Sequence, residues 1–359
     1  MDTPAPDALD RFCHAIPKVD LHVHLLGAVR PATFAELAAR PGSQVPAEEA
    51  RDFYERPEKG AIRVLRALEQ RVALTPADLH RITYEHLADF AGDGVRHSEI
   101  FWNPTGTAHL FPYAAGADAI LAGFEDAARD FGVTALLIPA VDREDTPEAA
   151  LALVEWMGAH RRDAIVGLGM DYREEGHPPE TFWRAYAEAG RLGFRRIAHA
   201  GEFGCHPRNI ATALDLLGCE RIDHGYTVLE DPALAARCAE RGIVFTVVPT
   251  NSYYRRTLPP ERWALDHPIR RMPAAGIAIH PNTDDPPLHR VTPAGCWRMM
   301  ARDFGFGLPE LRRCMRNGIR GSFLDDGAKR RLEADFTAEF DALAAECRPA
   351  TDPVQGHPA

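Results

Sequence analysis

Eight short apolar runs alternate with longer segments of helical periodicity along this chain of 359 residues. Each run has the length of a β-strand, and the apolar residues between runs recur with the spacing of one helix face. Strands that alternate with helices pair in parallel, and eight such units predict a closed (β/α)8 TIM barrel. The runs are 19–24, 95–101, 133–141, 164–170, 195–200, 220–224, 243–249 and 277–282.

Helical segments are expected between the runs and after the last one. Pro31, Pro147 and Pro207 stand where a first helical turn would begin, and Asp231-Pro232 opens another helix. From about residue 291 the chain reads as additional C-terminal helices, outside the barrel or at its bottom. We expect one domain over 1–359, with flexible tails at about 1–10 and 350–359. The expected helices are 62–91, 115–131, 146–160, 178–192, 207–217, 231–240, 308–318 and 327–346.

Composition narrows the possible partners and the location. The chain has 41 Lys plus Arg against 52 Asp plus Glu, a net charge of −11, so a nucleic-acid partner is not expected. No stretch approaches 18 apolar residues, which argues against a membrane span. The opening MDTPAPDALD lacks the features of a signal peptide. Seven cysteines without a C-x-x-C motif argue against a disulfide framework. We therefore expect a cytoplasmic protein.

Polar residues crowd the C-terminal ends of the apolar runs. In a TIM barrel these ends, with the loops that follow them, form the active site. A set of polar residues scattered over the surface would not concentrate there. The residues are His22, His24, Asn103, Asp171, His199, Glu202, His224, Asn251, Asp284 and Asp285.

His22 and His24 are candidate metal ligands. Two residues apart on a strand, their side chains share one face and can reach the same ion. A pair of half-buried, hydrogen-bonded histidines is the alternative. His199, His224 and Asp284 are candidate partners, and such a set leaves room for a water molecule on the ion, as a catalytic site requires. Zinc fits these nitrogen and oxygen ligands best, with iron and manganese as alternatives.

Three carboxylates near these histidines have two interpretations each. Glu202, three residues after His199, is placed to shuttle protons, or it is an ordinary carboxylate at a helix start. Asp284 and Asp285 repel each other unless one meets a cation and the other a hydrogen-bond donor. That pattern favours one on the metal and one on the substrate, whereas a simple Asn-Thr-Asp-Asp-Pro turn is the alternative.

Four motifs in this order resemble the adenosine deaminase branch of the amidohydrolase superfamily: LHVHLLG, HAGE, DHGY and NTDDP. The stretch DGVRHSEIFWNPT is similar to the second strand of that family, and LRRCMRNGIRGSFL to its C-terminal helix. The resemblance extends from about residue 16 to about residue 345. It implies hydrolytic deamination of an adenine-type compound, with release of ammonia.

The resemblance also implies a role for each motif residue. His22, His24, His199 and Asp284 would bind one Zn²⁺ per chain. Glu202 would protonate a ring nitrogen of the substrate, and His224 would orient or deprotonate the water on the zinc. Asp285 would hydrogen-bond another ring nitrogen.

The sequence departs from the family pattern on the substrate side. Leu26 stands where the family has an aspartate near the ribose 5′-hydroxyl, and Phe101 where it usually has an arginine. Tyr172 lies close to the position of a glycine that contacts the purine edge. Asn251 is a further polar contact in an altered seventh-strand segment. Adenosine, adenine and a modified adenosine thus remain candidate substrates.

Arg173, Arg255 and Arg256 could meet an anionic group of a modified substrate, or they are ordinary exposed arginines.

Two other functions stay open. One is a deaminase or amidohydrolase that acts on a non-purine heterocycle or an amide. Amidohydrolases with two metal ions often need a carboxylated lysine on a barrel strand. Neither Lys18 nor Lys59 ends a middle strand, which argues for one metal. The other is a non-catalytic metal-binding homologue.

Overall fold

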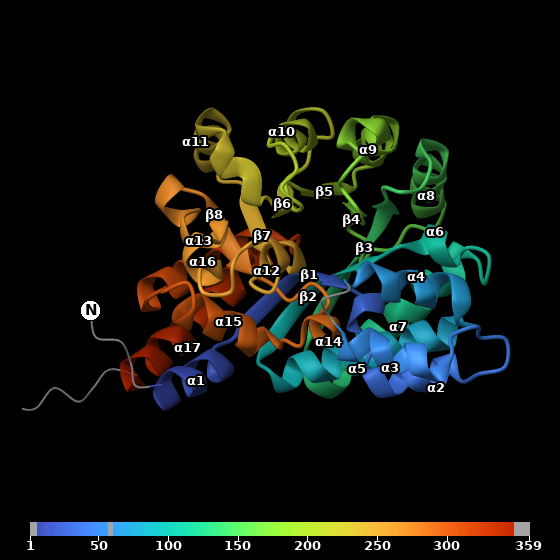
Figure 1. Ribbon diagram of the computed structural model, residues 1–359, viewed down its shortest axis with the longest axis horizontal. Coiled ribbons are helices and arrows are strands. Elements are labelled where there is room, and N and C mark those ends of the chain that lie inside the picture. The colour runs from blue at the N-terminus through green and yellow to red at the C-terminus, as the bar shows by residue number, and fades with distance from the viewer. Residues whose placement is uncertain (1–5, 57–59, 348–359) are drawn as a thin grey trace, which may run out of the picture.

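Eight parallel strands pair in the order β1 to β8 in the computed structural model, which describes residues 6–56 and 60–347. The sheet closes where Val23 forms a bridge with Asp284. There the His24 N–H donates to the Asp284 carbonyl oxygen at 3.0 Å, and the Asp284 N–H donates to that of His22 at 2.9 Å. The predicted (β/α)8 barrel is therefore confirmed (Figure 1). The strands are β1 (Lys18–His24), β2 (Val95–Trp102), β3 (Thr134–Asp142), β4 (Gly167–Asp171), β5 (Arg195–Ala200), β6 (Arg221–His224), β7 (Val244–Val247) and β8 (Ala278–Pro281).

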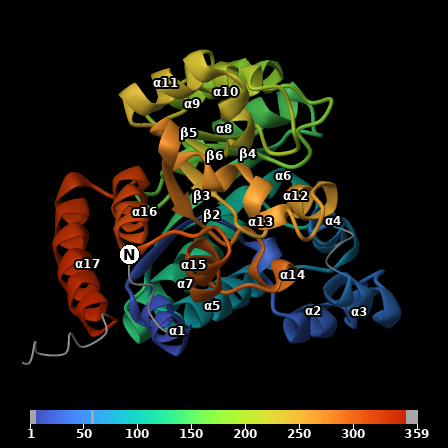
Figure 2. The same ribbon diagram turned by 60° about the vertical axis from the view of Figure 1, so that its left-hand side comes forward.

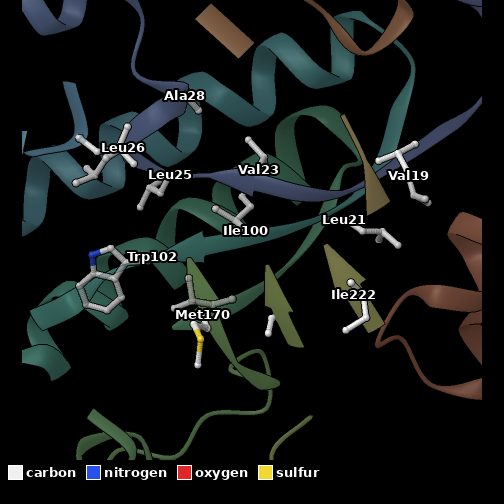
Figure 3. Packing of buried hydrophobic residues seen from close by; sticks show 14 of the residues in the cluster. Val19, Leu21, Val23, Leu25, Leu26, Ala28, Ile100, Trp102, Met170 and Ile222 are labelled. Atoms are coloured by element: carbon white, nitrogen blue, oxygen red, sulfur yellow. The ribbon is translucent and has the colours of Figure 1, made fainter. Parts of the chain in front are cut away.

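Strand β1 shows how the alternation of side chains divides the barrel wall. Leu21 and Val23 pack into the large apolar cluster between the strands and the helices (Figure 3). His22 and His24, on the opposite face, are buried and point toward His199 on β5. The two histidines therefore share the inward face, as their spacing predicts.

Helices surround the strands, and the connection from β1 to β2 is the most elaborate. It contains η1 and α2 to α5, so that α4 lies beside the C-terminal end of the barrel. The α-helices are α1 (Pro6–Ala15), α2 (Pro31–Ala38), α3 (Ala47–Glu55), α4 (Ile62–Arg71), α5 (Pro76–Gly92), α6 (Pro104–Thr107), α7 (Tyr113–Phe131), α8 (Pro147–Ala159), α9 (Trp183–Arg191), α10 (Arg208–Asp215), α11 (Pro232–Arg241), α12 (Ser252–Thr257), α13 (Trp263–Asp266), α14 (Pro286–His289), α15 (Pro293–Arg302), α16 (Leu308–Gly321) and α17 (Asp326–Glu346). The 3₁₀ turns are η1 (Leu26–Ala28), η3 (Pro179–Phe182), η4 (Tyr226–Glu230), η5 (Pro268–Arg270) and η6 (Pro273–Ala275).

One predicted helix is two helices in the structure. The segment 62–91 divides into α4 and α5, because Thr75 and Asp78 form a capping box that starts a new helix. The Asp78 N–H donates to Thr75 Oγ1 at 3.3 Å, and the Thr75 N–H donates to Asp78 Oδ2 at 2.9 Å. Pro76 occupies the first turn of α5, where its missing N–H costs nothing. The helical periodicity on both sides hides this break.

The C-terminal helices lie outside the barrel, as expected (Figure 2). Helix α16 packs against β8 so closely that a Cβ on Gly318 would lie 2.5 Å from the His280 ring. Helix α17 packs on α16, and Phe340 meets Phe12 of α1 edge to face, with ring centroids 5.0 Å apart. The two ends of the described chain are thus side by side.

The N-terminal end of the barrel is closed by a buried ion pair. Arg221, at the start of β6, donates from Nη1 to Glu99 Oε2 of β2 at 2.5 Å. Both side chains are buried, and the Phe323 ring, which follows α16, lies 4.7 Å from the guanidinium carbon. This end is filled, so access to the barrel interior comes from the other end.

The predicted tails fall largely outside the described residues. Residues 1–5 and 350–359 are not described, whereas α1 already begins at Pro6. Among residues 6–56 and 60–347, none of the helices has both the length and the apolar character that a membrane crossing requires.

Candidate active site

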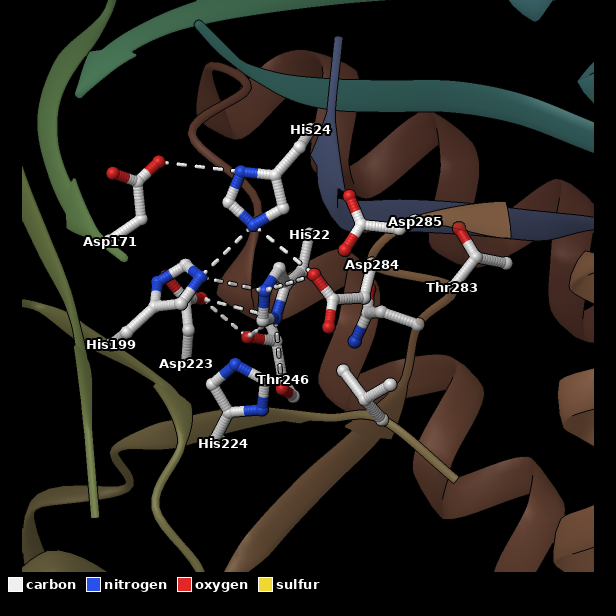
Figure 4. Close-up of polar contacts among 12 residues, drawn as sticks. His22, His24, Asp171, His199, Asp223, His224, Thr246, Thr283, Asp284 and Asp285 are labelled. Atoms are coloured by element: carbon white, nitrogen blue, oxygen red, sulfur yellow. Dashed lines mark hydrogen bonds and ion pairs between the residues drawn. The ribbon is translucent and has the colours of Figure 1, made fainter. Parts of the chain in front are cut away.

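Four side chains converge at the C-terminal end of the barrel, and all were expected to bind a metal (Figure 4). His22 and His24 come from the end of β1, His199 from the end of β5, and Asp284 follows β8. Nε2 of His199 lies 3.1 Å from Nε2 of both His22 and His24. Asp284 Oδ1 lies 3.2 Å from His24 Nε2 and 3.6 Å from His22 Nε2.

These separations fit a shared cation. Two nitrogen ligands of one tetrahedral zinc ion lie about 3.4 Å apart, because each Zn–N bond is about 2.0–2.1 Å long. Burial lowers the pKa of His22 to about 4, so its imidazole is neutral and offers a lone pair. Three imidazoles and one carboxylate that turn their acceptor atoms toward one point form a site for a divalent metal ion.

A surrounding set of acceptors holds the histidine rings in place. His199 Nδ1 lies 3.2 Å from Asp223 Oδ2, and His24 Nδ1 lies 3.3 Å from Asp171 Oδ2. His22 Nδ1 lies 3.2 Å from the Thr246 carbonyl oxygen. With Nδ1 of each ring facing an acceptor, Nε2 is left free for the metal.

Two of these holding residues were not singled out from the sequence. Asp223 precedes His224 in DHGY, and Thr246 lies within β7. Thr246 Oγ1 donates to Asp223 Oδ1 at 2.5 Å, so the two residues support each other. Asp171, expected at this end of the barrel, accepts from Asn103 Nδ2 at 2.6 Å.

Three of the predicted site residues hold a backbone conformation that is rare for residues other than glycine. Tyr172 has φ of +66°, and His224 and Asp284 both have φ of +65°. Such conformations cost free energy and persist only where the surroundings enforce them. They turn the His224 and Asp284 side chains toward the converging ligands at the ends of β6 and β8.

Glu202 and His224 face each other beside the metal ligands. Glu202 Oε2 lies 3.5 Å from His224 Nε2, and Glu202 Oε1 accepts from Asn251 Nδ2 at 3.0 Å. Burial, with the charges of Asp284 and Glu174, raises the pKa of Glu202 well above its usual value. Burial and the neighbouring histidines lower that of His224 well below its usual value. The surroundings thus favour the protonated carboxyl of Glu202 and the neutral imidazole of His224.

Asp285 lies next to the ligand Asp284 and is also buried. Burial, and then the charge of Asp284, raises its pKa well above the usual value. Its Oδ1 has no hydrogen-bond partner within the described part of the chain. A Cβ on Gly27 would lie 1.6 Å from this oxygen, so the glycine of LHVHLLG makes room for Asp285.

A cavity of about 480 Å³ opens onto these residues. His24, His199, His224, Asp284, Asp285 and Glu202 line its inner part, together with Asn251 and Tyr172. The Tyr172 hydroxyl donates to Glu69 Oε1 at 2.7 Å, and the Arg66 guanidinium carbon lies 4.0 Å from the Tyr172 ring centre. Arg173 and Arg256 also line the cavity, whereas Arg255 stacks on Trp263 at 5.0 Å.

Leu26 and Phe101 occupy other places. Leu26 begins η1 and is buried in the large apolar cluster. Phe101 packs against the His22, His24 and His199 rings, at centroid distances of 5.4 to 5.7 Å. Neither is among the described residues that line the cavity. The structure therefore brings the candidate metal ligands, Glu202 and His224 together with Asp285, Asn251 and Tyr172, whereas neither Leu26 nor Phe101 lines the cavity.

Lysine placement bears on a two-metal site. Lys18 Nζ donates to the carbonyl oxygens of His14, Ile16 and Asp93, near the start of β1. Lys329 lies on α17, and Lys59 is outside the described residues. No described lysine therefore reaches the metal ligands, which leaves a carboxylated lysine bridge without support.

Comparisons with known proteins agree with this geometry. The adenosine deaminase family model matches residues 17–338. An adenine deaminase of Streptomyces coelicolor is 34% identical over 333 residues, 91% of this chain and 95% of the relative. A zinc-bound amidohydrolase structure from Burkholderia ambifaria is 53% identical, with a TM-score of 0.93 over 97% of this chain and 96% of that one. The adenine deaminase structure from Arthrobacter aurescens is 31% identical, with a TM-score of 0.81 over 90% and 99% of the two chains.

Proposed function

The protein belongs to the adenosine deaminase family, and from this premise we propose that it hydrolytically deaminates an adenine-type compound at one zinc ion. The observation that carries the proposal is the shared cavity: Glu202, His224 and Asp285 line it beside the metal ligands. Zinc is favoured because the ligands are three imidazoles and a carboxylate, and because the Burkholderia ambifaria relative binds it.

A divalent ion in this site would lower the pKa of a water molecule and so supply a nucleophile at neutral pH. His224 is the group that takes up the proton of the attacking water, since its ring lines the cavity and lies 4.7 Å from the ring of His22 and 4.9 Å from that of His199, centroid to centroid. The water oxygen forms a bond to the ring carbon that bears the amino group.

Glu202 makes that carbon reactive. An aromatic amine is a poor electrophile, and protonation of the adjacent ring nitrogen disrupts the ring conjugation and accepts the charge. The raised pKa of Glu202 favours its protonated form, and Asn251 fixes one of its oxygens. His224 returns its proton to the amino group, the carbon–nitrogen bond breaks and ammonia leaves. The added hydroxyl gives its proton to Glu202, which restores the carboxyl and leaves a ring carbonyl.

Asp285 orients the purine ring in the cavity. Asp285 lines the cavity, and its carboxyl, one oxygen of which has no hydrogen-bond partner among the described residues, would meet a second ring nitrogen of the purine. Because the residue is buried, a substrate that leaves it unpaired would be disfavoured. This contact favours a purine over a simple amide as the substrate.

Ammonia release from a substrate panel tests the proposal. The panel contains adenine, adenosine and 5′-substituted adenosines, and the protein is loaded with zinc. Adenine comes first because the Streptomyces and Arthrobacter relatives are named adenine deaminases. We expect ammonia from at least one member, and a loss of about 10²–10⁴ in kcat for Glu202→Gln. A folded, zinc-loaded protein that is silent on the whole panel would contradict the proposal.

A further inference from the structure

Glu174 is a buried carboxylate that lies behind the active site. It follows β4 by three residues and is 2% exposed. Its Oε1 accepts from the Gly201 N–H at 2.8 Å and from Asn209 Nδ2 at 2.8 Å. Its Oε2 accepts from the Glu202 N–H at 2.9 Å. It is not among the described residues that line the cavity.

The turn after β5 requires an acceptor of this kind. Gly201 has φ of +72°, so the chain reverses there and two successive N–H groups point to the same side. Buried N–H groups without partners would each cost about 1–3 kcal/mol. One carboxylate with two oxygens satisfies both, and its negative charge shortens and strengthens the bonds.

The turn is also confined from its other side. A Cβ on Gly201 would lie 2.6 Å from Thr227 Oγ1 and 2.8 Å from Ile210 Cδ1. The backbone that carries Glu202 therefore has little freedom between these side chains and Glu174. Its direction determines where the Glu202 carboxyl meets Asn251 and His224.

We propose that Glu174 is a positioning residue for the reaction: through hydrogen bonds to the backbone of Gly201 and Glu202, it orients the Glu202 carboxyl toward the substrate. This inference rests on the proposed function, because it assigns Glu202 the proton transfer. Placement of a proton donor is demanding, since a shift of about 1 Å can lower the rate about 10²-fold.

Glu174→Gln tests the inference, because it keeps the size of the side chain but turns one acceptor into a donor that faces an N–H group. We expect kcat to fall at least about tenfold, with KM and bound zinc unchanged. Asn209→Ala removes one donor to Glu174 and should cause a smaller loss. Glu188→Gln, on the exposed face of α9, is the matched control and should keep full activity.

A double-mutant cycle separates positioning from a general structural role. If Glu174 acts through Glu202, Glu174→Gln should lower kcat no further in a Glu202→Gln background. Losses that multiply in the double variant would overturn the inference, as would a Glu174→Gln protein with lower thermal stability but unchanged kcat per bound zinc.

A crystal structure of Glu174→Gln adds a measurement that needs no activity. The Glu202 carboxyl should move away from Asn251 Nδ2, which it meets at 3.0 Å in the parent. An unmoved carboxyl would overturn the inference. If the parent releases no ammonia, the proposed function is overturned and the role of Glu174 with it. If the parent is active but the losses of kcat multiply in the double variant, only the role of Glu174 is overturned.

Discussion

The Asp223 carboxylate lies 3.2 Å from His199 Nδ1 and 3.9 Å from His22 Nδ1, so one buried side chain faces two metal ligands. We expect Asp223→Asn to weaken zinc binding about 10–100-fold, because an amide orients the two imidazoles less well. Competition with a chromogenic chelator measures this affinity. Asp215→Asn, on the surface of α10, is the control. Equal zinc affinity in the parent and Asp223→Asn would contradict this role of Asp223.

Gly27 makes room for Asp285, and this makes it a test of substrate binding. In Gly27→Ala a Cβ would lie 1.6 Å from Asp285 Oδ1, so the carboxyl must leave its present position. We expect kcat/KM to fall at least about tenfold while bound zinc remains near the parent value.

Steady-state ammonia release and elemental analysis measure the two quantities. Gly92→Ala is the control, because a Cβ there meets nothing within 4 Å. Parent-like kinetics for Gly27→Ala would show that Asp285 does not need its present position.

The fold could be predicted from the sequence because local and global signals agree. Each apolar run became a strand, and helical segments separate them. The capping box at Thr75 was hidden, since periodicity continues on both sides of it. Motif spacing also predicted which side chains converge at the candidate metal site, because strand ends in a barrel meet at one end.

Residues that act through other residues could not be predicted in this way. Glu174 lies in none of the four motifs, and Asp223 begins DHGY without any sign there of what it contacts; both roles depend on contacts between separate strands and loops. Leu26 shows the opposite difficulty: its place in the family pattern suggests the cavity, but η1 begins there and the side chain packs in the core. The direction of a side chain in a turn depends on tertiary packing.

The Arg221–Glu99 pair is a test of stability rather than chemistry. Glu99→Gln removes the carboxylate that lies 2.5 Å from the buried Arg221 guanidinium and leaves that guanidinium facing the more distant Asp223, 3.8 Å from Nε. We expect the free energy of unfolding to fall by about 3–5 kcal/mol. Chemical denaturation measures it. The exposed Arg195–Glu220 pair, also at 2.5 Å, is the matched control, and Glu220→Gln should cost less than about 1 kcal/mol. Similar losses in the two variants would contradict the distinction.

His267 links stability to pH. Burial, and then the charge of Arg255, lowers its pKa to about 3, and its Nδ1 accepts from the Ile269 N–H at 3.2 Å. The unfolded chain binds a proton here below about pH 6.5, whereas the folded chain does not, so acid favours unfolding. Asparagine keeps the acceptor but does not titrate. We therefore expect His267→Asn to be less stable than the parent overall. Between pH 7 and pH 5, however, its free energy of unfolding, measured with urea, should fall by about 2 kcal/mol less than that of the parent. His109→Asn, at the surface, should decline like the parent; equal declines in all three proteins would refute a neutral, buried His267.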